Sequence, residues 1–435
     1  MTIAPAAAQE ATLSPAGPAA EQERSLPPAA PDADQKPAPT PATADATVEA
    51  PATARPHVPD LSDCHQGPLE CFWLYGDYLL WWIKKGPLTQ PLLTAGSVGS
   101  NGNVVTGDVL LGNSSLDYGR FSGFEFGGGA WLDECHHWGL EGEGFFLERK
   151  TVHASFASDA NGNPVLARPF NDALSGLAPT AAIVSAPGAF SGSFAMSSSS
   201  RLWGTELNAL RNLYASPRFR ADWLLGFRYL DLQENLNLLQ QTQALANGQL
   251  FFLNNPANPN PAPVDALSIA DGFSTRNQVY LGQLGMRFEG HAGSAFFRVT
   301  AKAGFGPNHQ SVSIAGTTTA TLADGTTQTA SGGLLALPGA NIGRATNSPF
   351  VIVPQVDLRL GYQVTSRLQL FFGYDFLFIN EVARPGSQID LNVNTALVPS
   401  HPNFGAAAGP SVPSRLTKMD EFWAQGINFG IEFRY

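Results

Sequence analysis

The chain has 435 residues, only 14% of them charged, and a formal net charge of -11. This acidic balance argues against a nucleic-acid partner, which would require basic patches. No apolar run approaches the ~18 residues of a membrane-spanning helix. The three cysteines are too few for a disulfide scaffold and lack the C-x-x-C spacing of a zinc site.

The first sixty residues differ in composition from the rest of the chain. They are mostly Ala, Pro, Thr and acidic residues and include no aromatic residue. Such a segment cannot bury enough apolar surface to offset its ordering entropy. We therefore predict a disordered tether over residues 1–60 and one folded domain over 61–435. No basic and apolar signal region follows Met1, although Ala6-Ala7-Ala8-Gln9 is typical of the end of a cleavage site.

Ten segments of the folded domain are predicted to be β-strands, because most of them alternate apolar and polar residues with a period of two. The last is the clearest, since it alternates from Trp423 to the final residue, Tyr435. The first is apolar on both faces, and Gly127-Gly128-Gly129 weakens the second, where we expect a kink. The segments span about 71–82, 120–131, 137–149, 200–214, 218–232, 274–289, 294–306, 351–364, 367–379 and 420–435.

The connections between these segments alternate in length. Links after the second, fourth, sixth and eighth segments are short, whereas the other five run to roughly 35–50 residues, far above the usual ~4–6. Short turns on one rim and long loops on the other are typical of transmembrane barrels. We therefore predict an all-β fold: a transmembrane antiparallel up-and-down β-barrel of about ten strands, with short periplasmic turns and long extracellular loops. Further hairpins in the long loops would make twelve.

The face assignment follows from the predicted surroundings. In a membrane barrel the apolar faces meet lipid and the charged residues line the lumen, whereas a soluble barrel has the reverse arrangement. Strand length and the aromatic residues near the strand ends, such as Tyr229, Tyr362 and Trp423, favour the membrane alternative. The long loops are rich in Asn, Ser, Thr and Gly, and we expect a solvated tip at 159–163. Two alternatives stay open for the long loops: they fold into the lumen and narrow it, or they form an adhesive or antigenic surface.

Three motifs resemble a known family. Phe72 to Trp82 is similar to the first strand of outer-membrane porins grouped as beta-barrel porin family seven, and Gly226–Leu232 and Gln278–Arg287 look like further signatures of that family. The resemblance spans roughly residues 70–435 and excludes the tether. It implies an outer-membrane barrel more firmly than it implies transport.

Charged residues of both signs occupy the predicted lumen faces. They either line an aqueous pore with weak ion selectivity, or pair across strands and fill a narrow interior. A barrel of ten strands lies between filled eight-stranded barrels and open sixteen-stranded porins, which favours pairing. The candidates are Glu141, Glu143, Glu206, Arg220, Asp222, Arg228, Arg287, Glu289, Arg298, Lys302, Asp357, Arg359, Asp375, Glu432 and Arg434.

No catalytic constellation is apparent. The eight histidines fall mostly in the tether, turns or loops, and none stands in a Ser/His or Asp/His arrangement at a strand rim. His136-His137 could bind a metal with Cys135 or Glu134, but adjacent residues in a turn are more often merely solvated. We therefore expect no enzymatic activity, no cofactor and no metal.

The cysteines are predicted to lie near one another. Because the first two strands should be neighbours, Cys71 and Cys135 could approach within bridging distance in an oxidising periplasm. Cys64 competes as a partner, and free thiols are the other alternative.

The sequence therefore predicts a bacterial outer-membrane barrel with its tether in the periplasm. Passive diffusion of small polar solutes or ions is the leading function, and a structural or surface-interaction barrel without an open pore is the alternative. The expected partners are outer-membrane lipid, the barrel-assembly machinery and small polar solutes. Phe433 and the terminal aromatic Tyr435 are predicted to act as the assembly signal.

Overall fold

The computed structural model describes residues 72–96, 107–254, 263–406 and 409–435. These residues form strands and a few single turns of 3-10 helix. No helix in the described part of the chain is long and apolar enough to cross a membrane.

Twenty strands and three short helical turns follow one another along the described chain. Their bounds are β1 Phe72–Ile83, β2 Gly86–Leu88, β3 Leu93–Gly96, β4 Asp108–Leu111, β5 Ser114–Leu116, β6 Phe121–Trp131, β7 Trp138–Leu147, β8 Lys150–Ala157, β9 Val165–Asp172, η2 Ala173–Ser175, β10 Ala178–Ser185, β11 Phe190–Ala215, β12 Phe219–Ala244, β13 Val264–Ala292, β14 Ala295–Leu322, β15 Thr327–Ser331, β16 Gly343–Asn347, β17 Phe350–Gln363, β18 Leu368–Ala383, η3 Pro385–Gln388, β19 Asn392–Val393, η4 Thr395–Leu397 and β20 Met419–Arg434.

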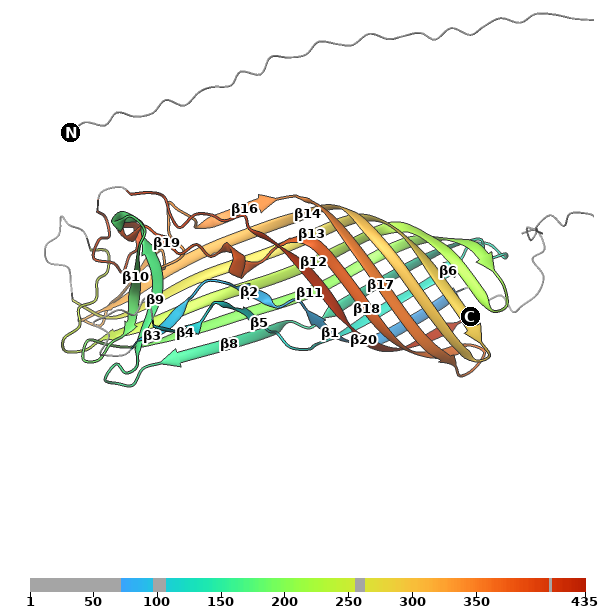
Figure 1. The fold of residues 1–435 in the computed structure, drawn as a ribbon, viewed down its shortest axis with the longest axis horizontal. Coiled ribbons are helices and arrows are strands. Elements are labelled where there is room, and N and C mark those ends of the chain that lie inside the picture. The colour runs from blue at the N-terminus through green and yellow to red at the C-terminus, as the bar shows by residue number, and fades with distance from the viewer. Residues whose placement is uncertain (1–71, 97–106, 255–262, 407–408) are drawn as a thin grey trace, which may run out of the picture. The chain divides into compact units, whose positions relative to one another are not determined.

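Ten of these strands close into an antiparallel ring, in the order β1-β6-β7-β11-β12-β13-β14-β17-β18-β20 and back to β1 (Figure 1). The last strand pairs with the first, and Phe72 and Tyr435 exchange backbone hydrogen bonds of 3.0 and 2.9 Å at the rim of short turns. The ten-strand up-and-down barrel is therefore confirmed. Within the described residues β8, β15 and β16 pair only with a single ring strand, so the ring does not grow to twelve.

The two faces of the ring strands differ as expected for a membrane barrel. Outward positions carry large exposed apolar side chains, such as Leu225 (67%), Phe227 (53%) and Leu360 (63%), whereas inward positions carry buried charges such as Glu432 (1%). Charges inside and apolar groups outside are the reverse of a soluble fold. The predicted face assignment is confirmed.

Strands β11 to β14 are much longer than predicted. Each has 26 to 29 residues, about twice the predicted length, and they run together past the rest of the ring towards the end opposite the C-terminus (Figure 1). In β12 the continuous row of apolar outward positions ends at Tyr229, eleven residues from the start, which matches the ~9–11 residues that cross a bilayer. The remaining residues of these strands therefore project beyond the membrane.

The long loops are ordered over most of their described length. The loop strands β3, β4, β9 and β10 form a second sheet, which shares a large apolar core with the projecting strands through residues such as Leu93, Phe170 and Phe273. Composition hid this core because its apolar residues lie singly or in short groups, such as Leu92-Leu93, among polar residues. The tip at Asp159 is indeed exposed, and its carboxylate accepts hydrogen bonds from the backbone N–H groups of Asn161 and Asn163.

The triple glycine does not kink its strand. β6 runs unbroken through Gly127 to Gly129. A Cβ at Gly127 would lie 2.4 Å from the Tyr75 ring, and one at Gly129 would lie 2.3 Å from the Trp73 ring. The glycines therefore let two large inward side chains of β1 lie across β6.

Deleting Phe433 to Tyr435 should impair barrel assembly. The deletion removes backbone pairing between β20 and β1 and two outward aromatic side chains, Phe433 (41%) and Tyr435 (53%). Assembly can be measured as heat-modifiable gel mobility of the membrane fraction. Normal insertion of the truncated chain would refute the role of these residues as the assembly signal.

Candidate functional site

The lumen of the ring contains the charged residues that were predicted to face inward from the alternation of apolar and polar residues. All fifteen candidates lie at inward positions of the ring strands, and most are almost completely buried. They are not arranged as separate groups along a water-filled wall. The bonds between them cross the interior in layers.

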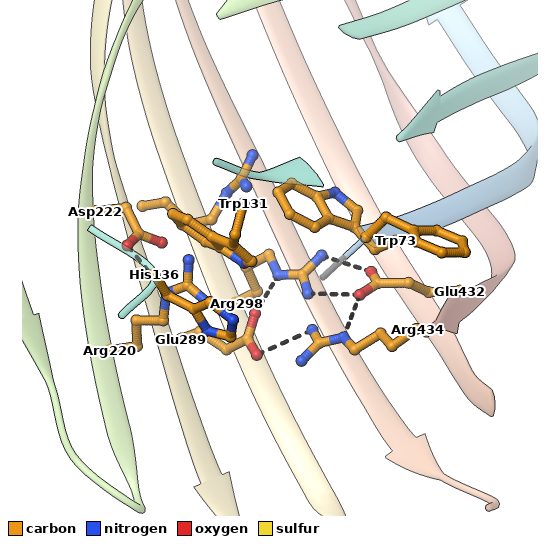
Figure 2. Close-up of a pocket in the computed structure, with 11 residues that line it drawn as sticks. Trp73, Trp131, His136, Arg220, Asp222, Glu289, Arg298, Glu432 and Arg434 are labelled. Carbon is orange, nitrogen blue, oxygen red and sulfur yellow. Dashed lines mark hydrogen bonds and ion pairs between the residues drawn. The ribbon is translucent and has the colours of Figure 1, made fainter. Parts of the chain in front are cut away.

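The first layer closes the mouth at the short-turn rim. Arg298 bonds to Glu289 at 2.6 Å and to Glu432 at 2.8 Å, and Arg434 bonds to the same two carboxylates at 3.1 and 2.7 Å (Figure 2). Arg434 on β20 and Glu289 on β13 are separated by three ring strands, so their bond crosses the lumen.

Trp73 and Trp131 flank this layer, and a cavity of only about 80 Å³ remains beside them. The Trp131 ring stacks on His136 and also lies under the guanidinium of Arg220, 4.0 Å from its ring centre. Burial, and then the nearby Arg220, lower the pKa of the His136 imidazole in this turn. The turn therefore presents a neutral ring to the mouth at neutral pH.

The next layer is centred on Lys302. Its ammonium lies 3.0 Å from Glu143, 2.8 Å from Glu206 and 3.4 Å from Asp357, and its side chain is 3% exposed. Glu143 on β7 and Lys302 on β14 are again three strands apart by the shorter way round the ring. Arg228 lies 3.5 Å from the second oxygen of Glu206.

Two arginines complete the charged part of the lumen. Arg287 forms a two-pronged pair with Glu141, with 2.8 and 2.5 Å between donor and acceptor. Arg359 bonds to Glu125 at 2.8 Å across the interior, and its guanidinium lies over the rings of Tyr75 and Phe371. Planar guanidinium groups suit such stacked and bidentate arrangements.

Sequence reasoning missed Glu125 and Asp77, which face each other on β6 and β1. Glu125 could have been found from the alternation of Phe124, Glu125 and Phe126. Asp77 gave less signal, because it is the single charge in a strand that is apolar on both faces. It is 3% exposed, and neither of its carboxylate oxygens has a hydrogen-bond partner among the described residues.

Beyond the charges, the lumen is filled by apolar side chains. Leu79 and Trp81 of β1 continue the inward row of Asp77, and they belong to a cluster with inward residues of every other ring strand except β14. The cluster comprises Leu79, Trp81, Ile83, Tyr118, Phe121, Phe145, Leu147, Leu202, Leu230, Leu232, Val279, Leu281, Val351, Val353, Leu377, Ile379, Val382, Phe422 and Ala424. The first strand is apolar on both faces because one face meets lipid and half of the other meets this cluster.

A completely buried ion pair lies above the apolar layer. Arg384 bonds to Glu234 at 2.8 and 2.7 Å, both side chains are 0% exposed, and Arg384 also donates to the carbonyls of Lys84 and Lys85. Sequence reasoning missed both partners, since Glu234 lay past the predicted end of its strand and Arg384 lay in a predicted loop.

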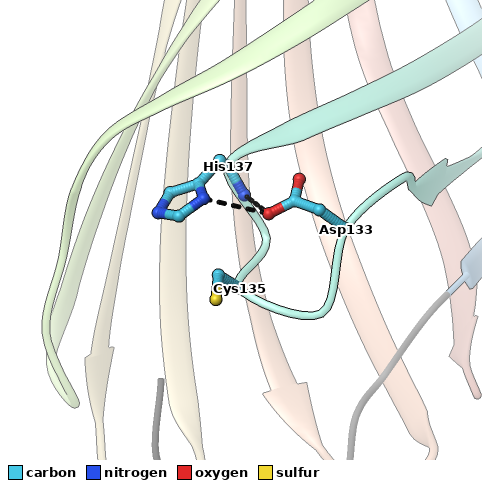
Figure 3. Close-up of side chains that lie close together, drawn as sticks. All are labelled: Asp133, Cys135 and His137. Atoms are coloured by element: carbon cyan, nitrogen blue, oxygen red, sulfur yellow. Dashed lines mark hydrogen bonds and ion pairs between the residues drawn. The ribbon is translucent and has the colours of Figure 1, made fainter. Parts of the chain in front are cut away.

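The Asp133, Cys135 and His137 side chains lie close together in the turn between β6 and β7 (Figure 3). Their possible ligand atoms are within 4.8 Å of one another, and Asp133 pairs with His137 at 3.0 Å. Cys135, however, is disulfide-bonded, so its sulfur is not a thiolate that could bind a metal. Cys64 and Cys71 lie outside the described residues, and the pairing of Cys71 with Cys135 stays a prediction.

A closed ring with exposed apolar groups outside and charges inside defines a transmembrane β-barrel of the bacterial outer membrane. The family model described as "Putative beta barrel porin-7" matches residues 73–435, and the chain belongs to this family.

Solved structures to which the chain is similar include the outer membrane protease OmpT of Escherichia coli, with 8% identity, a TM-score of 0.37, and coverage of 83% of this chain and 97% of that one. The toluene transporter TbuX of Ralstonia pickettii shows 8% identity, a TM-score of 0.17, and coverage of 84% and 90%. For the toluene transporter TodX of P. putida the corresponding values are 10%, 0.14, 85% and 90%. No curated protein matches the sequence.

Replacing Lys302 by Met should destabilise the barrel strongly. The substitution keeps the length of the side chain but leaves Glu143 and Glu206 buried without their cation, which typically costs about 3–5 kcal/mol. Urea unfolding in liposomes measures the free energy of unfolding. Lys85→Met is the matched control, because Lys85 and its partner Asp117 are 57% and 60% exposed and such a pair contributes at most about 1 kcal/mol. Equal stability of the two variants would contradict the role given to Lys302.

Replacing Cys71 by Ser should leave Cys135 as a free thiol, whereas Cys64→Ser should leave it bonded. The expectation rests on the predicted adjacency of the first two strands, now seen as the pairing of β1 with β6. Alkylation without reduction, followed by peptide mass mapping, identifies the free cysteine in each variant. A free Cys135 in the Cys64→Ser variant would show that Cys64 is the partner.

Proposed function

We propose that the protein is a structural and surface-interaction barrel of the outer membrane, whose lumen is closed and whose projecting sheet acts outside the cell. This is the second of the two functions predicted from the sequence. Ion pairs that bridge the lumen carry the proposal.

The energetics of these pairs support a closed resting state. A solute would have to separate Arg298 from Glu289 and Glu432, and Lys302 from Glu143 and Glu206. Each separated ion would stand in a poorly hydrated interior, where an uncompensated charge is costly. The apolar layer above would then have to part as well, and aliphatic and aromatic side chains make up nearly all of it, so it gives a hydrated ion few polar contacts.

The part beyond the membrane supports a role at the surface. A buried ion pair fixes the inward side of the projecting strands, since Arg168 and Asp271 bond at 2.6 Å with side chains 1% and 0% exposed. The second oxygen of Asp271 accepts the backbone N–H groups of Leu334, Leu335 and Ala336. A loop region held in this way presents a fixed surface to a partner, which lowers the entropy cost of binding.

Passive diffusion of small polar solutes is the rival proposal, and membership of a porin family supports it. It requires that the charged and apolar layers move aside.

We also propose that the barrel-assembly machinery inserts the chain, and that segment 1–60 lies in the periplasm, because Phe72 is at the rim of short turns.

Conductance in planar bilayers separates the two proposals. The wild-type protein should show no channel steps at any voltage, because both layers block the lumen. A Trp81→Ala/Phe145→Ala variant, which removes two rings 5.2 Å apart in the apolar layer, should also show none, because the ion pairs of Arg298 and Lys302 still bridge the lumen. Heat-modifiable mobility confirms that each protein is folded and inserted. Regular steps from the wild-type protein would overturn the closed barrel and establish the diffusion proposal.

A further inference from the structure

The outward face of β11 to β14 changes from apolar to polar side chains at the same height on all four strands. Leu207, Phe227 and Phe305 lie below it, exposed and apolar. The next rows contain Tyr229, Tyr280 and Trp203, whose rings contact one another with centres 5.1 and 5.2 Å apart. Aromatic rings of this kind gather at a membrane–water interface. Above them the outward positions are mostly Ser, Thr, Asn and Gln, so the outer boundary of the bilayer lies at this level.

Arginines occupy the outward face directly above the aromatic rows. Arg201 on β11 and Arg276 on β13 lie in one row across the sheet, joined through Gln233 of β12. The same row reaches Ser311 of β14, and Arg344 of β16 donates to the Ser311 hydroxyl at 2.7 Å. Since neighbouring strands are about 4.8 Å apart, the backbones of Arg201 and Arg276 are roughly 10 Å apart.

The positive charge of this row is not cancelled. Apart from Asp265 in the bulge at the far end of β13, Asp231 is the only carboxylate at an outward position of these four strands. Asp231 is 0% exposed and is already satisfied by Arg276 at 2.6 and 3.0 Å and by the Tyr229 hydroxyl at 2.9 Å.

The other two arginines therefore add charge to the surface. Arg201 is exposed and has no hydrogen-bond or ion-pair partner among the described residues, and Arg344 is exposed with only the Ser311 hydroxyl.

On the opposite side of the barrel, at the outer end of β1, the lysines are paired with carboxylates. There Lys84 pairs with Asp420 and Glu421, and Lys85 pairs with Asp117. Lysines and carboxylates cancel on that side.

We propose that Arg201, Arg276 and Arg344 form a binding site for the phosphorylated headgroup of a glycolipid in the outer leaflet. Guanidinium groups bind phosphate oxygens in a bidentate way. The aromatic rows below would contact the sugar and the start of the acyl chains, and the Ser and Asn rows above would contact the rest of a sugar headgroup. The site lies on the outside of the barrel, so it is independent of whether the lumen opens.

The test uses the full-length protein, refolded in detergent, and diphosphorylated lipid A as the probe. Native mass spectrometry counts the lipid molecules retained by each protein. The Arg201→Gln/Arg344→Gln variant should bind at least about tenfold more weakly than the wild type, because two charged hydrogen-bond donors are lost. Arg276 is left in place, since its removal would strand the buried Asp231.

Two controls define the outcome. Arg218→Gln, in an exposed turn at the other end of the barrel, should leave binding unchanged. Lipid A without its phosphates should bind the wild type as weakly as diphosphorylated lipid A binds the double variant. Equal retention of both lipids by the wild type, or full retention by a double variant that keeps heat-modifiable mobility, would overturn the proposal.

Discussion

The number of strands in the ring determines what the inside of this barrel can be. Ten strands enclose a space of intermediate width, which inward side chains can fill if they are long and reach across. Lys302, Arg298 and Arg359 do so, since each forms an ion pair with a carboxylate on a ring strand that is not its neighbour. Because lipid surrounds the barrel, the charges cannot turn outward, and pairing inside is their one low-energy arrangement.

The lumen then divides into a charged half and an apolar half, which act differently. The charged half fixes distances across the ring through directional bonds, for example the two-pronged pair of Arg287 and Glu141. The apolar half excludes water. The charges of the Arg384–Glu234 pair above it are therefore not screened by solvent, and both side chains are 0% exposed. The long strands β11 to β14 carry the same inward packing past the membrane, where loop strands take the place of the missing ring strands.

Alternation, together with the lengths of the connections and the aromatic residues near the strand ends, was sufficient to predict the ring, its faces and most of the inward charges. Alternation specifies a face because side chains of a strand point to opposite sides with a period of two. It could not specify which charges pair, because partners such as Arg359 and Glu125 lie 234 residues apart. Nor could it show where β12 ends, because beyond Tyr229 the outward face becomes mainly polar, while the inward face, charged up to Arg228, becomes mainly apolar from Leu230. The loop core was hidden because its apolar residues lie singly or in short groups among polar residues.

Access of a thiol reagent to the apolar half of the lumen tests the filled interior most directly. Val353 is 0% exposed and lies in that layer, whereas Ser268 lies on the outward face beyond the membrane. In liposomes, a Cys at position 268 should react with a membrane-impermeant methanethiosulfonate, and peptide mass mapping should find a Cys at position 353 unmodified from either side. Comparable modification of both positions would mean that water and solutes reach the centre of the barrel, which contradicts a filled lumen.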